Sequence, residues 1–184
     1  KITEKNNNFK IFDQKIKLKN EEAEQALLGA LLYNNGTYEK ISDFLKKEHF
    51  SNKNHLKIYE AISFLIESGQ TADPITLNHY LSKTNSYTQK EQTAYLNKLI
   101  ESVVSIVNTE DYGEIIYDLY LRRELIILAE IIAKDAQKFQ IEEKATHQIE
   151  RIEKKLFNLA SKGNVENNVI NFAKALNLAI QSAQ

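Results

Sequence analysis

The amino-acid sequence predicts an all-α protein with a compact helical head, a long antiparallel helical hairpin and a C-terminal linker helix. Helix breakers are scarce: the 184 residues include five glycines and one proline, where average usage would give about twenty. Long stretches rich in Leu, Ile, Ala, Glu and Lys carry apolar residues at helical spacing. The last two long stretches are regular enough to pair as a hairpin.

The composition limits the class of protein. Hydrophobic residues make up 42% and charged residues 27% of the chain, which is typical of a globular protein. The net charge of −1 gives no sign of non-specific nucleic-acid binding. The absence of cysteine excludes disulfides, thiolate metal sites and a thiol nucleophile.

The apolar runs and the ends of the sequence indicate the cellular compartment of the protein. No apolar run reaches the length of a membrane span, and no signal peptide pattern is present. We therefore predict a cytoplasmic protein without membrane partners. The sequence begins at Lys1 and contains no methionine, so we expect a processed product or a piece of a longer protein.

Residues 1–19, "KITEKNNNFKIFDQKIKLK", are interpreted as a flexible basic arm. Six lysines stand against Glu4 and Asp13, and an asparagine run interrupts them. Such an arm could touch an acidic partner, although a solvated tail is the simpler interpretation.

The head is predicted over residues 20–108. Asn20 fits an N-cap, with Glu21, Glu22 and Glu24 in the first turn of a helix that runs to about Tyr33. Gly29 costs about 1 kcal/mol in a helix interior, a cost that close approach of a neighbouring helix would offset. Further helices are expected over about 38–45, 54–68, from Pro74, and 89–102.

The hairpin is predicted over residues 109–162. Thr109 is a candidate cap for a helix of nearly thirty residues that ends near Phe139. After a short break, a second helix from about Lys144 to Ser161 has apolar residues in a 4-3-4-3 spacing, which is a heptad seam. Residues 163–168 are a polar linker, and residues 169–184 form an amphipathic helix on that tether.

No motif in the chain supports catalysis. The five glycines are too scattered for a phosphate loop or a dinucleotide fingerprint. The four histidines lack the spacing of H-E-x-x-H or of a di-iron bundle, so we predict no metal, no cofactor and no catalytic residue. The stretch "KKEHFSNKNHLK", 46–57, could suggest nucleic-acid binding, but a solvated loop with Phe50 in the core is the preferred interpretation.

Several dispersed motifs resemble the bacterial hexameric replicative DNA helicases, the DnaB family. "NEEAEQALLGALL" is similar to the opening motif of the family's N-terminal domain, "EAEQ…LG". "DFLKKEHFSNKNHLKIYEAISFLIESGQTADPITLNHYL" follows the pattern "F…H..I…I..L…G…D..TL…L", and "AYLNKLIESVVSIVNTEDYGEIIYDLYLRRELI" follows "YL..L……N...Y..I……R.LI". The resemblance covers residues 20 to about 162. The proline that usually precedes the opening motif is absent, and the basic arm is not part of the pattern.

The resemblance implies a role in DNA replication. The parent protein would be an ATP- and magnesium-dependent helicase that unwinds DNA at the replication fork, with its RecA-like motor beyond residue 184. This chain would then be no enzyme by itself and would meet DNA only through the full-length ring. Its head and hairpin would form dimers, three of which make a collar that receives primase, and the linker helix would dock on the motor domain of the neighbouring subunit.

Site residues follow from the helical spacing and the resemblance. The wide apolar arc of the hairpin is expected to face partly the second hairpin helix and partly a second subunit, although the head could cover the excess. The predicted dimer interface comprises Leu121, Leu125, Leu128, Ile132, Ala136, Phe139, Ile149, Ile152, Leu156 and Leu159. By resemblance, Tyr95, Ile126 and Ile132 relate to primase, although for each residue taken alone a place in the core is the favoured interpretation. Linker-helix docking is assigned to Val169, Phe172, Leu176 and Ile180.

Two alternatives belong to other classes. The chain could be a free-standing all-α adaptor without a motor, and a phosphate loop encoded downstream of Gln184 would exclude this. The chain could also be an enzyme by itself, which turnover of added nucleotide would reveal. For the last helix, folding back onto the head is the alternative to a tether.

Overall fold

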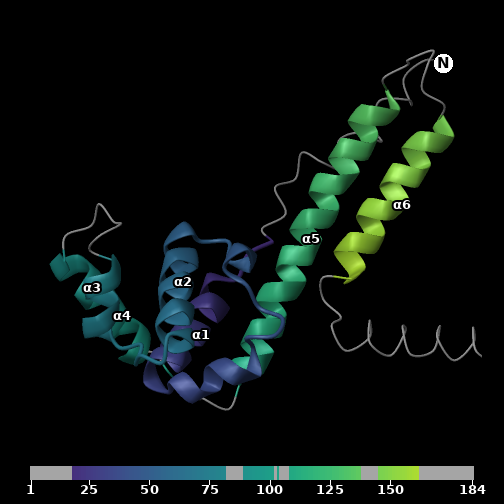
Figure 1. The fold of residues 1–184 in the computed structure, drawn as a ribbon. Helices are drawn as coiled ribbons and strands as arrows, with labels where there is room; N and C mark the ends of the chain where they lie inside the picture. Colours follow the sequence, from purple (N-terminus) through teal and green to yellow (C-terminus); the bar gives the residue numbers. More distant parts are fainter. Residues whose placement is uncertain (1–17, 82–88, 102, 104–107, 138–144, 162–184) are drawn as a thin grey trace, which may run out of the picture.

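The computed structural model describes residues 18–81, 89–101, 103, 108–137 and 145–161 (Figure 1). Within these ranges all regular elements are helices, as the sequence predicts. They are α1 (Glu21–Tyr33), the 3₁₀ turns η2 (Asn35–Lys40) and η3 (Lys47–His49), α2 (Lys53–Glu67), α3 (Pro74–Leu81), α4 (Gln89–Glu101), α5 (Thr109–Ala136) and α6 (Ala145–Ser161).

Helix α1 is the centre of the head and contacts α2, α4 and α5. Leu27, Leu28 and Leu31 on it are fully buried. The Asn20 side chain accepts a hydrogen bond from the Ala23 amide at 2.9 Å, which confirms the predicted N-cap.

Gly29 lets α4 approach the backbone of α1. An added Cβ would lie 2.2 Å from the Leu99 carbonyl oxygen and 2.9 Å from the Val103 side chain. The expectation that Gly29 permits close contact with a neighbouring helix is therefore confirmed, and the neighbour is the C-terminal part of α4.

The segment after α1 differs from the expected helix over 38–45. It forms the 3₁₀ turn η2 and then a hydrogen-bonded turn. The Asn34 side chain accepts from the Gly36 amide, and the Asn35 side chain bonds the backbone of Leu31 and Ala72. Asn34 offers the backbone a local partner that competes with a regular α-helix, and Asn35 also joins this turn to Ala72, 37 residues away.

The ends of α2 and α3 follow their sequence signals. Gly69 ends α2 with a φ of 73°, a left-handed conformation that favours glycine. Asp73 Oδ1 accepts from the amides of Ile75 and Thr76 at 2.8 Å each, so it caps α3 just before Pro74.

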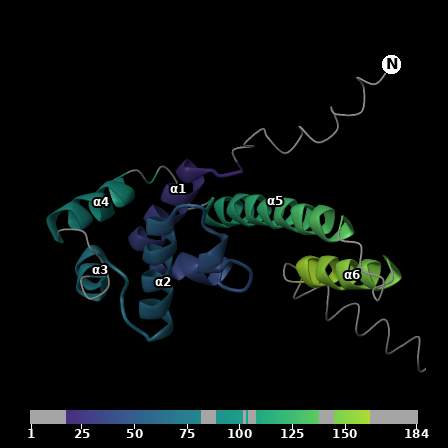
Figure 2. The ribbon, with the colours of Figure 1, turned by 90° about the horizontal axis from the view of Figure 1, so that it is seen from above.

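Helix α5 belongs to both the head and the hairpin (Figures 1 and 2). It begins at Thr109 itself, and Asn108 takes the N-cap position without a side-chain cap bond, so the proposed Thr109 cap is wrong by one residue. Its first half packs into the head, where Ile116 and Tyr120 are buried. Its second half leaves the head and pairs with α6. The predicted boundary between head and hairpin at residue 108 stays a prediction.

Other predictions fall outside the described residues. These are the basic arm up to residue 17, Phe139 at the end of the first hairpin helix, and everything from residue 162 onward, including the linker and its helix.

Candidate interaction surfaces on the hairpin and at its base

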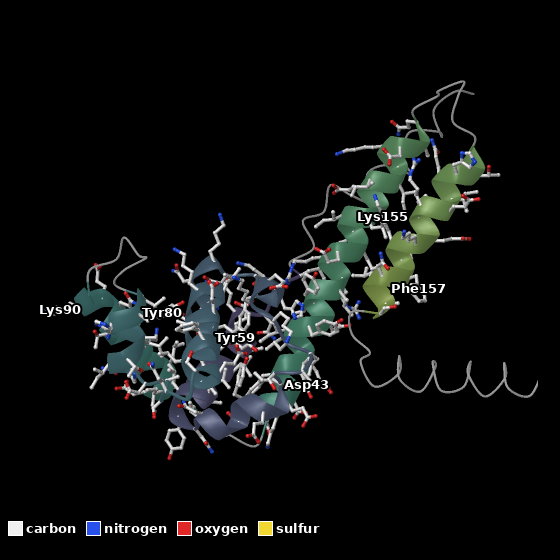
Figure 3. All side chains as sticks on the ribbon, in the orientation of Figure 1. Asp43, Tyr59, Tyr80, Lys90, Lys155 and Phe157 are labelled. Carbon is white, nitrogen blue, oxygen red and sulfur yellow. The ribbon has the colours of Figure 1, made fainter. Side chains whose placement is uncertain are left out.

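Some residues of the predicted dimer interface pack between α5 and α6 of the same chain, in the contact that we call the seam. Leu128 is 8% exposed, and with Ile131, Ile132 and Ile152 it lines a small gap between the two helices. Polar groups border the same gap, and Figure 3 shows Lys155 on the side of α6 that faces α5. These four apolar residues therefore hold the hairpin together within one chain.

A second set of apolar residues beside the seam is exposed. Leu125 is 47%, Ile149 54% and Leu156 43% exposed. Leu125 is followed at helical spacing by Ala129, Ala133 and Ala136 on one side of α5.

These residues share one face of the hairpin. An antiparallel helix pair has an approximate two-fold axis perpendicular to its plane. Residues therefore lie on the same face of the pair when they are rotated from the seam in the same direction about their own helix axis, each helix being viewed from its N-terminus. Leu125 on α5 and Ile149 and Leu156 on α6 meet this condition. We call Leu125, Ala129, Ala133, Ala136, Ile149 and Leu156 the hairpin face.

Other apolar residues of the hairpin lie elsewhere. Ile127, 49% exposed, projects from the side of α5 opposite Leu125. Phe157, 70% exposed, points away from α5 (Figure 3). Leu121 and Leu159, two further members of the predicted dimer set, are half-buried.

Tyr95 of α4 ends a chain of buried hydrogen bonds. Its hydroxyl lies 2.6 Å from His55 Nε2 on α2, and His55 Nδ1 lies 2.6 Å from Glu24 Oε2 on α1. The Ser51 amide and hydroxyl donate to Glu24 Oε1 at 2.6 and 2.7 Å, and the Gln25 side chain lies 3.4 Å from the Tyr95 hydroxyl.

The hydrogen-bond donors around Glu24 determine which atoms of this network are protonated. Burial by itself raises the pKa of Glu24, but hydrogen bonds from His55 and Ser51 outweigh it and hold the pKa below its ordinary value. The carboxylate is therefore ionised and accepts from His55 Nδ1–H. In the neutral ring Nε2 then accepts from the Tyr95 hydroxyl, and the tautomer is assigned from this pattern.

The order acid, histidine, hydroxyl is similar to a hydrolytic triad, but its setting is different. His55 is fully buried and Glu24 is 2% exposed, so no substrate reaches them. Burial also raises the pKa of Tyr95, which opposes a nucleophilic phenolate. The network ties α1, α2 and α4 together. Sequence reasoning did not assign Glu24 or His55 this role, although both stand in the quoted motifs.

Arg123 fastens α5 to the head where the helix leaves it. Its guanidinium donates to the Leu18 carbonyl at 2.8 Å and to the His49 carbonyl at 2.6 Å. It also lies over the Tyr120 ring, 5.9 Å from the centroid. The His49 ring packs on Tyr120 with centroids 4.3 Å apart, so the contact joins η3, α5 and the start of the described chain.

The residues related to primase by resemblance lie in two places. Tyr95 is in the head, within the network to α1 and α2. Ile126 and Ile132 are half-buried on the part of α5 beyond the contacts of Arg123. Their role in binding stays a prediction.

The basic stretch 46–57 is explained by structure. Phe50 is 4% exposed and packs on Tyr59 with centroids 4.8 Å apart, which confirms its place in the core. Lys47 pairs with Glu60, and Lys46 donates to the Ser42 carbonyl at 2.7 Å. Tyr59 itself lies in the middle of the head (Figure 3).

The described part of the chain lacks two other kinds of site. It contains no group of three His, Cys, Asp or Glu side chains placed to hold a metal ion. None of its helices combines the length and the apolar character needed to cross a membrane.

Comparison with known proteins identifies the family. Residues 16–118 match the model of the DnaB-like helicase N terminal domain. The chain belongs to this family. It is 44% identical over 144 residues to a replicative DNA helicase DnaB of Rickettsia conorii, a match that covers 78% of this chain and 29% of that protein. The chain thus spans about a third of the length of such DnaB relatives.

Two solved structures share the DnaB N-terminal fold. The N-terminal domain of DnaB helicase from Mycobacterium tuberculosis has a TM-score of 0.67 at 21% identity, covering 76% of this chain and 97% of that chain. A DnaB-like replicative helicase, solved with its interactions with primase, has a TM-score of 0.62 at 22% identity, covering 86% of this chain and 35% of that one.

The structure gives each DnaB motif a physical role. Glu24 and Gln25 of "EAEQ", His55 of the second motif and Tyr95 of "YL" meet in one hydrogen-bonded network. Gly29 of "LG" meets the Leu99 backbone. In the last motif, Arg123 of "R.LI" fastens α5 to the head.

Proposed function

We propose that this chain is the collar domain of a replicative DNA helicase and that it assembles through its hairpin. Copies pair through the hairpin face, three such dimers form a ring, and the collar receives primase. The whole protein is an ATP- and magnesium-dependent helicase acting in the cytoplasm at the replication fork. Residues 169–184 dock on the motor domain of the neighbouring subunit, and DNA is contacted through the full-length ring.

The observation that carries the assembly proposal is the unburied hairpin face. Each of its largest members, Leu125, Ile149 and Leu156, leaves about half of its surface in solvent. A contiguous apolar face on a two-helix projection is the kind of surface that a second copy covers in a two-fold dimer. The head does not cover it, because the second half of α5 leaves the head (Figure 2).

Two matched variants test the assembly. Leu125→Glu places a charge on the hairpin face, whereas Ile127→Glu places it at equal exposure on the opposite side of α5. Sedimentation should show a helical monomer for Leu125→Glu and an unchanged dimer for Ile127→Glu. Equal masses for both variants would remove the hairpin face as the interface. Leu128→Glu is a poorer probe because Leu128 is in the seam of the hairpin itself.

Primase binding is proposed from the family and from the neighbour whose structure includes interactions with primase. Tyr95, Ile126 and Ile132 are the candidate residues. Tyr95→Ala should weaken binding of the cognate primase C-terminal domain while circular dichroism stays helical. Tyr33→Ala, at an exposed tyrosine on α1, is the control. Unchanged affinity in Tyr95→Ala would remove Tyr95 from the proposed surface.

A further inference from the structure

The buried hydrogen-bond network of the head has one end inside the protein and the other at its surface. The inner end is the Glu24 carboxylate, which accepts from the Ser51 amide and hydroxyl and lies 2.6 Å from His55 Nδ1. The outer end is the half-buried Gln25 on α1, whose side-chain nitrogen lies 3.4 Å from the Tyr95 hydroxyl. His55 and Tyr95 therefore connect a buried carboxylate to an amide at the surface.

With a neutral His55 ring, every hydrogen bond in this connection points inward. Tyr95 donates its hydroxyl proton to Nε2, and Nδ1–H donates to Glu24. The Tyr95 oxygen is then available as an acceptor, so Gln25 meets it with the amide nitrogen. The separation of 3.4 Å is long for such a bond, and Gln25 is therefore held only loosely in this state.

A second proton on the His55 ring requires the opposite direction beyond Nε2. This nitrogen then carries a hydrogen and donates to the Tyr95 oxygen, so the Tyr95 hydroxyl must donate outward. Half a turn of the Gln25 side-chain amide exchanges its nitrogen for its oxygen, which accepts that hydrogen. The added proton comes from water, and no covalent bond of the protein breaks. Hydrogen bonds that start from a charged donor are also stronger than neutral ones.

Few charged groups surround His55. On α1, Glu24 contacts Nδ1 directly, and Glu21, one turn earlier, is close enough to interact with a charge on the ring. From α4 the facing group is the Tyr95 hydroxyl, and Arg123 of α5 interacts with Glu24. The charged ring would thus form an ion pair with a carboxylate that the network already keeps ionised.

We propose that proton uptake by His55 reverses its hydrogen bond with Tyr95 and turns the Gln25 amide at the surface between α1 and α4. The head thereby reports the protonation of a fully buried ring at a place that a partner can contact. Helices α1, α2 and α4 stay tied together in both states, because each polar group keeps a partner. The proposal uses residues of the head alone and does not depend on the proposed helicase function.

Nitrogen-15 NMR of the full chain can follow His55 and the Gln25 side-chain amide as the pH is lowered. The ring should change from protonation at Nδ1 alone to protonation at both nitrogens, and the Gln25 amide signals should shift with the same midpoint. Circular dichroism at each pH verifies that the chain stays folded. In Tyr95→Phe, His55 should still take up the proton, whereas Gln25 should no longer respond.

A second variant tests the same coupling from the surface. Coupling between two sites is reciprocal, so a Gln25 amide that stabilises the charged ring also raises the affinity of His55 for the proton. Gln25→Leu should therefore lower this affinity about threefold, the effect of losing one modest hydrogen bond. Asn97→Leu makes the same kind of change at an exposed site on α4 and should leave the affinity unchanged.

Three results would overturn the proposal. The first is a His55 ring that keeps a single proton over the whole pH range in which the chain is folded. The second is a Gln25 amide that stays unchanged as His55 becomes charged, or that shifts equally in Tyr95→Phe, because the Tyr95 hydroxyl would then relay nothing. The third is the same midpoint for His55 in Gln25→Leu and in the unchanged chain.

Discussion

Replacing Gly29 with alanine tests the packing of α1 against α4. The new Cβ would stand 2.2 Å from the Leu99 carbonyl oxygen, where ordinary contact begins at 3.4 Å. The obstacle is backbone, which no rotamer change can move aside. Helix α4 must therefore retreat by roughly 1 Å, which is the difference between those two separations.

The expected cost follows from two opposing effects. Overpacking of a well-packed core costs about 1–3 kcal/mol, and the retreat of α4 also loosens the fully buried Leu96 and Leu99. Against this, alanine is better than glycine in a helix by about 1 kcal/mol. Taking the upper end of the first effect, we expect the free energy of unfolding to fall by about 2 kcal/mol.

Gly113→Ala is the matched control. Its Cβ would meet the side chains of Ile41 and Phe44 at 3.0 Å, and side chains adjust more easily than a carbonyl. The gain in helix propensity then roughly offsets the crowding. Urea unfolding followed by circular dichroism, at one fixed protein concentration, measures both variants. Equal stability of Gly29→Ala and the unchanged chain, or a larger loss in Gly113→Ala, would refute this explanation of Gly29.

Three further predictions concern the head. The pKa of Glu24 lies below its ordinary value of 4.5. The ionised Glu24 therefore stabilises the folded chain above the unfolded pKa, and this stabilisation is lost as pH falls through the folded pKa. Glu24→Gln should then flatten the acid limb of a plot of unfolding free energy against pH. Tyr95→Phe leaves His55 Nε2 without its donor and should cost about 1–3 kcal/mol in urea unfolding, whereas Tyr33→Phe, at an exposed site, should cost nothing measurable. Arg123→Lys loses the two-pronged contact with Leu18 and His49 and should cost about 1–3 kcal/mol, while Arg122→Lys, in an exposed ion pair with Asp118, should leave the unfolding curve unchanged.

Helix positions in the head were predictable because their signals are local. Asn20 caps α1, Pro74 begins α3 and Gly69 ends α2 through residues within one turn of each end. The segment 38–45 was mispredicted because its turn depends on Asn35 bonding the backbone of Ala72, 37 residues away. A helical pattern in the sequence does not reveal such a competitor.

The hydrogen-bonded network of Glu24, His55 and Tyr95 could not be derived from spacing. Glu24 and His55 are 31 residues apart, and His55 and Tyr95 are 40 apart. Only the packing of α1, α2 and α4 brings them together, and buried polar groups then require partners. For the hairpin, spacing gave the apolar set, but the pairing of α5 with α6 was needed to separate the seam residue Leu128 from the exposed Leu125.

The central claim, that copies of this chain pair through the hairpin face, is tested most directly by single-cysteine cross-linking. The chain has no cysteine of its own, so Ala129→Cys on the hairpin face and Lys134→Cys on the opposite side each provide one thiol. A two-fold dimer brings the same face of both copies together. Reaction with a short bifunctional maleimide should give a covalent dimer for Ala129→Cys, although the side chain at this position is less exposed than Lys134. Cross-linking at Lys134→Cys but not at Ala129→Cys, or equally poor cross-linking at both, would contradict the account.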